Sequence, residues 1–216
     1  FISSQAYPNN KKVPSVPFKM AGSYVVINLT INNSTPLSMI LDTGVKNTII
    51  NELMEGDDVP LNKTTTDSTL IQGLGNNQGL RAHRSYKNDL KIGNLIFNNK
   101  VVLLLPENIF NFTNYTGKKI NGILGSDILK DYVVEINYTK LRVYFYNSDT
   151  FVVPGKYSSI PATVVNNKMY VDALYTGADS VPRNVRMLVD TGAELGSWLF
   201  NSSISSMPKK KVYGYI

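Results

Sequence analysis

Apolar and polar residues alternate along much of the chain in short runs, which is the period-2 pattern of β-strands. Ser23–Ile31 and Leu37–Leu41 are two such runs, and the turn-forming cluster Asn32–Pro36 separates them. The alternation is clearest from 141 to 146, where Leu, Val and Phe face one side while Arg and two Tyr face the other. This last run is predicted to pair with Val133–Ile136 as a hairpin.

Helical patterns are few and short. Ser126 is a candidate N-cap for a helix through Ile128, Leu129 and Tyr132, and Thr48–Met54 is a second candidate helix. The 24 Asn, 15 Gly and 10 Pro residues also favour turns over long helices. The sequence therefore predicts a mostly β fold with one or two short helices.

One segment of the chain is repeated. Ser23–Val25 and Met39–Gly44 in the first half correspond to Met169–Val171 and Met187–Gly192 in the second half. Both copies end in Asp-Thr-Gly, and the intervals from tyrosine to aspartate are 18 and 20 residues. Three apolar residues precede each aspartate, which predicts a buried strand that carries the carboxylate to the start of a turn.

A pair of aspartates suits acid–base chemistry at neutral pH better than a single one. A lone aspartate with a pKa near 4 is fully ionised there, but two carboxylates about 3 Å apart cannot both ionise. A pair formed by Asp42 and Asp190 would hold one proton, so that one carboxylate takes a proton from water while the other donates to a peptide carbonyl. The titration belongs to the pair, and the sequence assigns the proton to neither residue.

The residues after each aspartate fit the same interpretation. Gly44 and Gly192 allow a tight turn beneath the carboxylate, where a Cβ would clash. Thr43 and Thr191 carry short, stiff hydroxyls that can brace the two loops against each other. Two similar loops that meet across a pseudo-two-fold axis bring like residues into contact.

At these residues the chain resembles the aspartic peptidases of the pepsin and retroviral-protease type. The closer resemblance is to bacterial retropepsin-like proteins with two lobes in one chain, which often continue into a PDZ-like module. Ile120–Gly125 followed by Ser126–Leu129 is similar to the family's apolar-apolar-Gly segment and the short helix after it. Gln72–Gly79 lies where the family has its flap, a hairpin that closes over bound peptide, with the flap residues Gly73, Leu74 and Gly75.

The resemblance implies an acid-protease β-barrel lobe, an aspartic endopeptidase without cofactor or metal, and a peptide or protein substrate. The implied division is a lead-in segment at 1–16, a complete lobe at 17–150 and an incomplete second lobe at 155–216. Only 26 residues follow Asp190, so we expect a second flap to lie outside this sequence and the chain alone to be weakly active or inactive. Val45 departs from the family's Ala, Ser or Thr, whereas Ala193 is typical.

Composition excludes several other chemistries. The chain has no Cys and a single His, His83, which excludes disulfide scaffolds, thiolate sites and His-rich metal sites. The 22 basic and 16 acidic residues give a net charge of +6, but the lysines are dispersed, so nucleic acid is not an expected partner. No apolar run approaches the roughly 18–20 residues of a membrane helix.

Several alternatives stay open at this stage. The lobes are also compatible with a catalytically silent peptide-binding or structural module, or with a homodimer that pairs Asp42 from two chains instead of a monomer with pseudo-two-fold lobes. His83 is interpreted as a solvent-facing strand residue, and Asp57 and Asp58 as a solvated surface. The absent initiator Met and the family resemblance favour a periplasmic or secreted protein.

Overall fold

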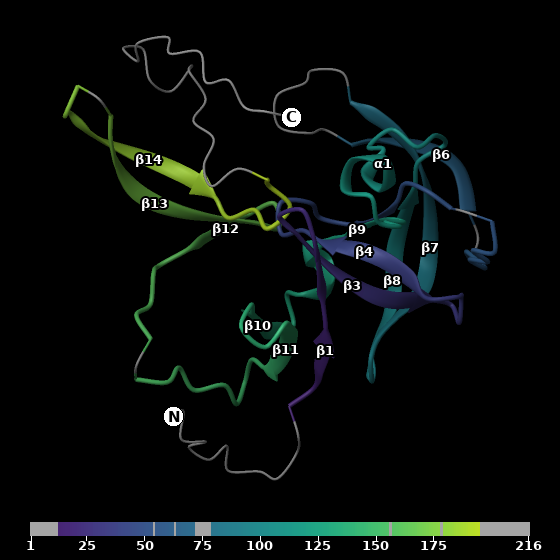
Figure 1. Ribbon diagram of the computed structural model, residues 1–216, viewed down its shortest axis with the longest axis horizontal. Coiled ribbons are helices and arrows are strands. Elements are labelled where there is room, and N and C mark those ends of the chain that lie inside the picture. The colour runs from purple at the N-terminus through teal and green to yellow at the C-terminus, as the bar shows by residue number, and fades with distance from the viewer. Residues whose placement is uncertain are drawn as a thin grey trace.

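The computed structural model describes residues 13–53, 55–62, 64–71, 79–155, 157–177 and 179–194. These residues form the mostly β, acid-protease-like architecture that the sequence predicts, with a closed barrel in the first lobe and a separate small sheet near the second aspartate. Figure 1 shows the barrel strands at the right and the second sheet projecting at the left.

An eight-stranded sheet forms the first lobe. A pairing between β3 and β7, Thr30 opposite Lys91, closes six of its strands into the barrel. In spatial order the strands are β2 (Lys19–Ala21), β3 (Tyr24–Ile31), β4 (Leu37–Leu41), β9 (Gly122–Leu124), β5 (Thr48–Ile50), β8 (Leu95–Leu104), β7 (Leu80–Ile92) and β6 (Thr64–Ile71).

A three-stranded sheet packs against this barrel and shares its main core. It consists of β1 (Ser15–Pro17), β11 (Arg142–Asn147) and β10 (Tyr132–Asn137), and β10 and β11 are the predicted hairpin. Strand β1 lies partly in the segment interpreted as a lead-in, and Val16 is buried in the main core. The short run Ser15–Pro17 was missed because its apolar contact is with a strand about 127 residues later in the chain.

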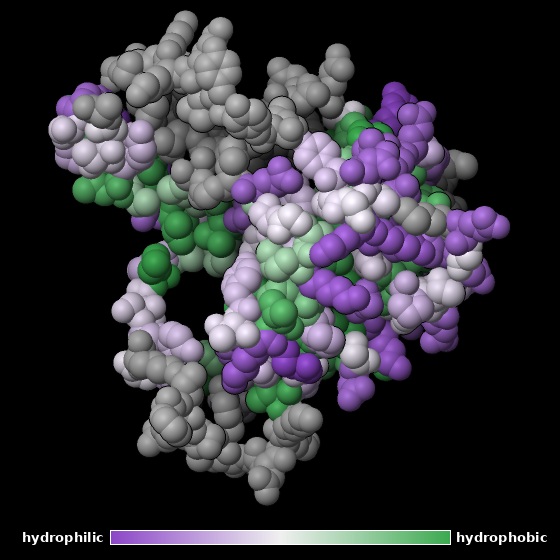
Figure 2. Space-filling model, in the orientation of Figure 1, coloured by the Kyte–Doolittle hydropathy of each residue, from purple (hydrophilic) through white to green (hydrophobic). Residues whose placement is uncertain are grey.

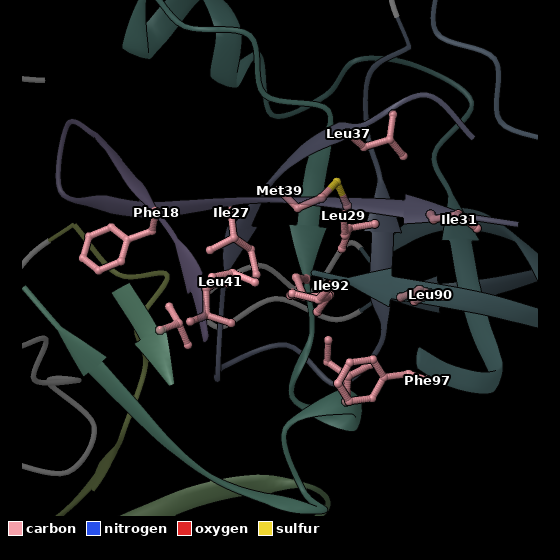
Figure 3. Close-up of a cluster of buried hydrophobic side chains, with 14 of the residues drawn as sticks. Phe18, Ile27, Leu29, Ile31, Leu37, Met39, Leu41, Leu90, Ile92 and Phe97 are labelled. Atoms are coloured by element: carbon pink, nitrogen blue, oxygen red, sulfur yellow. The ribbon is translucent and has the colours of Figure 1, made fainter. Parts of the chain in front are cut away.

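The core follows from the period-2 alternation of the barrel strands. Ile27, Leu29 and Ile31 point inward from β3, where they meet Leu90 and Ile92 of β7 (Figure 3). Each of these five side chains is almost fully excluded from water. Burying a side chain of this size contributes about 1.5–3 kcal/mol before the entropy of ordering it is subtracted.

The second sheet is far less enclosed. It consists of β12 (Thr163–Val165), β13 (Lys168–Thr176) and β14 (Pro182–Leu188), and none of the residues of these three strands is buried. Asn166 and Asn167 both have positive φ in the two-residue turn between β12 and β13, which is a conformation that asparagine tolerates well. Figure 2 shows apolar side chains gathered over this sheet.

The predicted helix at Thr48–Met54 is wrong. Thr48–Ile50 form strand β5, which pairs in parallel with β8 and antiparallel with β9. All three residues are β-branched and buried, and both properties favour a central strand over a helix. The helix that does form, α1 (Phe112–Thr116), was not predicted. No helix among the described residues is both long and apolar enough to cross a membrane.

The second predicted helix is shorter than expected. Ser126–Ile128 form the 3₁₀ turn η1, and β10 begins at Tyr132. Ser126 does not cap this turn. Its hydroxyl donates instead to the Asn167 carbonyl in the second lobe, at 3.0 Å.

Asp57 is also not the solvated residue that the sequence analysis expected. Its side chain is only 3% exposed and accepts hydrogen bonds from Lys119 Nζ and from Asn121 Nδ2. Asn121 in turn donates to the Glu52 carbonyl, so these polar groups tie the segment after β5 to the residue that precedes β9.

Replacing Gly122 with alanine tests the close packing of β9 on β5. A Cβ at this position would overlap the Ile49 carbonyl, which is backbone and cannot move aside. We expect the free energy of unfolding, measured by urea denaturation, to fall by about 1–3 kcal/mol. Gly155→Ala is the matched control, because a Cβ there meets nothing within 4 Å. Equal stability of the two variants would contradict this packing.

Candidate active site

Two strands from different lobes deliver the two Asp-Thr-Gly loops. Strand β4 ends at Leu41, directly before Asp42, and β14 ends two residues before Asp190. The first loop is supported from below by β9, because Asp42 N donates to the Leu124 carbonyl at 3.0 Å. Strand β9 belongs to the apolar-apolar-Gly segment Ile120–Gly125 of the sequence analysis, and Leu41 lies opposite Leu124 in the parallel pair.

The turn after β9 continues this support. Ser126 N donates to the Val45 carbonyl at 2.8 Å, and Asp127 N donates to the Lys46 carbonyl at 3.0 Å. These bonds fix the backbone on the far side of the first glycine. The first loop is therefore held by main-chain hydrogen bonds at both of its ends.

The two loops are joined by four reciprocal hydrogen bonds. Thr43 N donates to Thr191 Oγ1 and Thr191 N donates to Thr43 Oγ1, both at 3.1 Å. Each hydroxyl then donates across to the opposite strand end: Thr43 to the Val189 carbonyl at 2.7 Å, and Thr191 to the Leu41 carbonyl at 2.8 Å. The arrangement is the same when the two loops are exchanged, as a pseudo-two-fold axis requires.

Each glycine lies against the partner loop's aspartate. A Cβ on Gly44 would meet Asp190 Cγ at 2.6 Å, and one on Gly192 would overlap the Asp42 carboxyl. Any larger residue would push the two loops apart. The glycines are thus required by the close approach of the loops as well as by the turn that the sequence analysis considered.

Asp42 is a buried carboxyl, 8% exposed, held by its own loop. Gly44 N and Val45 N donate to its Oδ1 at 2.7 and 3.2 Å, so the backbone supplies two donors where Val45 lacks a hydroxyl. Burial raises the pKa of Asp42 to about 7, with the negative charge of Asp190 and a hydrogen bond to that carboxyl acting in the same direction.

Asp190 is half-buried in the equivalent position of the second loop. Gly192 N donates to its Oδ1 at 2.8 Å, which mirrors the bond from Gly44 to Asp42. The structure thus brings together the six loop residues selected from the sequence: Asp42, Thr43, Gly44, Asp190, Thr191 and Gly192.

A cavity of about 200 Å³ opens beside the first loop. Strands β6, β7 and β8 of the first lobe contribute to its walls, and Lys168 of the second sheet also lines it. Its lining residues are Gly44, Val45, Lys46, Asn47, Ile49, Thr69, Leu70, Ile71, Arg84, Leu103 and Lys168. The sequence analysis did not identify the charged members of this set.

A further polar contact lies at the second loop. The Glu194 carboxylate accepts a hydrogen bond from the Tyr24 hydroxyl, and burial together with the Glu194 charge raises the pKa of that tyrosine above its ordinary range. Tyr24 also packs edge-on against Phe112 of α1. This contact connects the end of the second Asp-Thr-Gly segment to the barrel.

The remaining predicted site residues are placed as follows. Gly73, Leu74 and Gly75 lie outside the described residues, although Ile71 and Leu80 on either side of them pair as the end of the β6–β7 ladder. His83 is half-buried on β7 opposite Leu104 and does not line the cavity.

Removing one threonine hydroxyl tests the joined loops. Thr43→Ala deletes the acceptor for the Thr191 amide, so we expect that amide to exchange with solvent roughly tenfold or more faster, the equivalent of one ordinary hydrogen bond. NMR hydrogen exchange measures this rate. Thr43→Ser keeps the hydroxyl and serves as the control; unchanged exchange in Thr43→Ala would show that the loops are not joined in this way.

Comparison with known proteins agrees with this geometry. Residues 27–128 match the model of the aspartyl protease family, and no curated protein matches the chain. The matched range contains the first Asp-Thr-Gly loop and β9, which supports that loop from below; Asp190 lies beyond it. The match over residues 27–128 is consistent with a retropepsin-like aspartic peptidase.

Proposed function

We propose that the protein is an aspartic endopeptidase in which Asp42 and Asp190 act as one catalytic pair. The observation that carries this proposal is the reciprocal bonding of Thr43 and Thr191, which brings each aspartate against the glycine of the other loop. A peptidase-type function is supported independently by the family match.

The raised pKa of Asp42 supports the acid–base roles. With the pKa of Asp42 at about 7, the pair retains one proton at mildly acidic to neutral pH. The ionised carboxylate accepts a proton from a water molecule as the water oxygen bonds to the peptide carbonyl carbon. The protonated carboxyl donates to the carbonyl oxygen, which gives a neutral tetrahedral intermediate.

Breakdown of that intermediate returns the pair to its starting state. The carboxyl that received the water proton delivers it to the leaving nitrogen, the carbon–nitrogen bond breaks, and the second carboxylate recovers a proton from an intermediate hydroxyl. Loop rigidity matters here, because a displacement of about 1 Å at the reacting groups reduces the rate by roughly 100-fold. The four threonine hydrogen bonds and the β9 contact provide that rigidity.

The substrate is an extended peptide that lies across both aspartic loops. The β6–β7 hairpin borders this site, because Ile71 and Arg84 from these strands line the cavity beside Gly44. A hairpin in this place can cover the peptide and exclude water from the reacting bond.

Replacing Asp42 with asparagine is the direct test. The amide keeps the size of the carboxyl and can still accept from Gly44 N, so the fold should persist, but the pair loses its shared proton. We expect peptide cleavage to fall by roughly 10²–10⁴-fold or to background. Asp149→Asn, an exposed carboxylate outside the site, is the control. Undiminished cleavage by a folded Asp42→Asn protein would refute the assignment.

The pH dependence of cleavage provides a second test. Above about pH 7 both carboxylates are ionised and no proton remains for the carbonyl, so kcat/KM should fall roughly tenfold per pH unit. Burial raises the folded-state pKa of Asp42, so its contribution to the free energy of unfolding declines as pH rises from about 4 to 7. Asp42→Asn should abolish that decline. A kcat/KM that stays constant up to about pH 9 would contradict a shared proton.

A further inference from the structure

The two aspartic loops are followed by residues of opposite charge. Lys46 stands two residues after Gly44, and Glu194 stands two residues after Gly192. The reciprocal threonine bonds relate the loops by a pseudo-two-fold axis, so these two positions lie on opposite sides of the aspartate pair. A peptide that crosses the pair therefore meets a basic side chain on one side and an acidic one on the other.

The basic side is the side that contains the cavity. Lys46, Arg84 and Lys168 all line it, and they come from the first loop, from β7 and from β13 of the second lobe. No acidic side chain is among its lining residues. Its volume of about 200 Å³ equals that of roughly seven liquid waters, which is enough for one amino-acid side chain.

The cavity also has an apolar part. Val45, Ile49 and Leu103 contribute aliphatic groups to its lining. The methylenes of an acidic side chain suit such a surface, and its carboxylate suits the cationic edge. Carboxylates that meet arginine and lysine form charge-assisted hydrogen bonds, which are about twice as strong as neutral ones.

The two lysines of the cavity, Lys46 and Lys168, have no acidic ion-pair partner among the described residues. Burial raises the pKa of Asp127 to about 6. Lys46 is one of three lysines whose charges act in the opposite direction on that carboxyl. Arg84 donates to Thr69 Oγ1 on the neighbouring strand, which fixes its guanidinium at the cavity wall.

The opposite side of the aspartate pair differs in charge. Glu194 lies there beside the Tyr24 hydroxyl and contributes to the raised pKa of that tyrosine. An acidic substrate side chain would be repelled on that side and attracted on the cavity side. The charge difference therefore discriminates between the two possible directions of an acidic peptide.

We propose that this cavity is a specificity pocket for the side chain of a glutamate or aspartate in the peptide substrate. The proposal rests on the endopeptidase function and adds its substrate class. The three cations select the carboxylate, and Glu194 fixes the direction in which the peptide binds.

Quenched fluorescent peptides with acetylated and amidated ends provide the test. A parent peptide that the chain cleaves is varied to Glu, Gln or Lys at each of three positions on both sides of the cleaved bond. At one position, the kcat/KM of the Glu peptide should be about 10–100-fold higher than that of the Gln peptide. The difference from the Lys peptide should be larger still. No preference for Glu at any position would overturn the proposal.

Charge reversal assigns that preference to the cavity. Lys168→Glu should strongly reduce the preference for Glu over Gln at that position, because it replaces one of the three cations with an acidic side chain. Lys91→Glu is the matched control, because this exposed lysine lies seven residues beyond Arg84 on β7 and does not line the cavity. A preference that survives in Lys168→Glu, or that Lys91→Glu removes equally, would refute the pocket.

A binding measurement separates this proposal from the catalytic one. Fluorescence anisotropy with the Asp42→Asn chain compares labelled Glu and Gln versions of one amidated peptide, without any need for turnover. Tighter binding of the Glu peptide, lost in Lys168→Glu, supports the pocket even if the wild-type chain cleaves nothing. Equal binding of the two peptides, or a preference that appears only with a free C-terminal carboxylate, overturns it.

Discussion

The arrangement of the site depends on one interaction, the reciprocal hydrogen bonding of Thr43 and Thr191. Each threonine uses its hydroxyl as donor and acceptor at once, so two residues satisfy two amides and two strand-end carbonyls from opposite lobes. Partly buried main-chain groups at a loop need such partners, since an unsatisfied one costs about 1–3 kcal/mol. The contact leaves room for no side chain at Gly44 or Gly192, because the opposite carboxyl already occupies that space.

The two loops are supported unequally. The first loop forms main-chain hydrogen bonds with β9 and η1, in which Asp42 N, Ser126 N and Asp127 N are the donors. Among the described residues the second has a corresponding strand-end bond only from Val189 N to the Met169 carbonyl, and its sheet contains no buried residue. The position of the second aspartate therefore relies on the threonines and on contacts from the barrel. Lys168 is adjacent to Asn167, whose carbonyl accepts a hydrogen bond from the Ser126 hydroxyl, so its place beside the first loop also depends on contacts between the lobes.

The sequence predicted the features that are local or repeated. The doubled Asp-Thr-Gly, the Leu37–Leu41 strand and the bracing threonines could be found because each has its signal within a few residues. The helix predicted at Thr48–Met54 failed because pairing with β8 and β9, distant in sequence, decides that conformation. The basic cavity was missed for a similar reason: Lys168 joins it only through docking of the lobes. Extending the repeat alignment by two residues would have shown the opposite charges after the glycines.

Shared protonation of Asp42 and Asp190 is measured most directly by neutron diffraction from crystals at about pH 5, below the pKa of about 7 for Asp42. The proposed catalytic pair predicts a single deuteron between carboxyl oxygens about 2.5–2.7 Å apart, the usual length of a hydrogen bond between a carboxyl and a carboxylate. Carboxyl groups more than about 4 Å apart, each with its own protonation state and no deuteron between them, would contradict the catalytic pair.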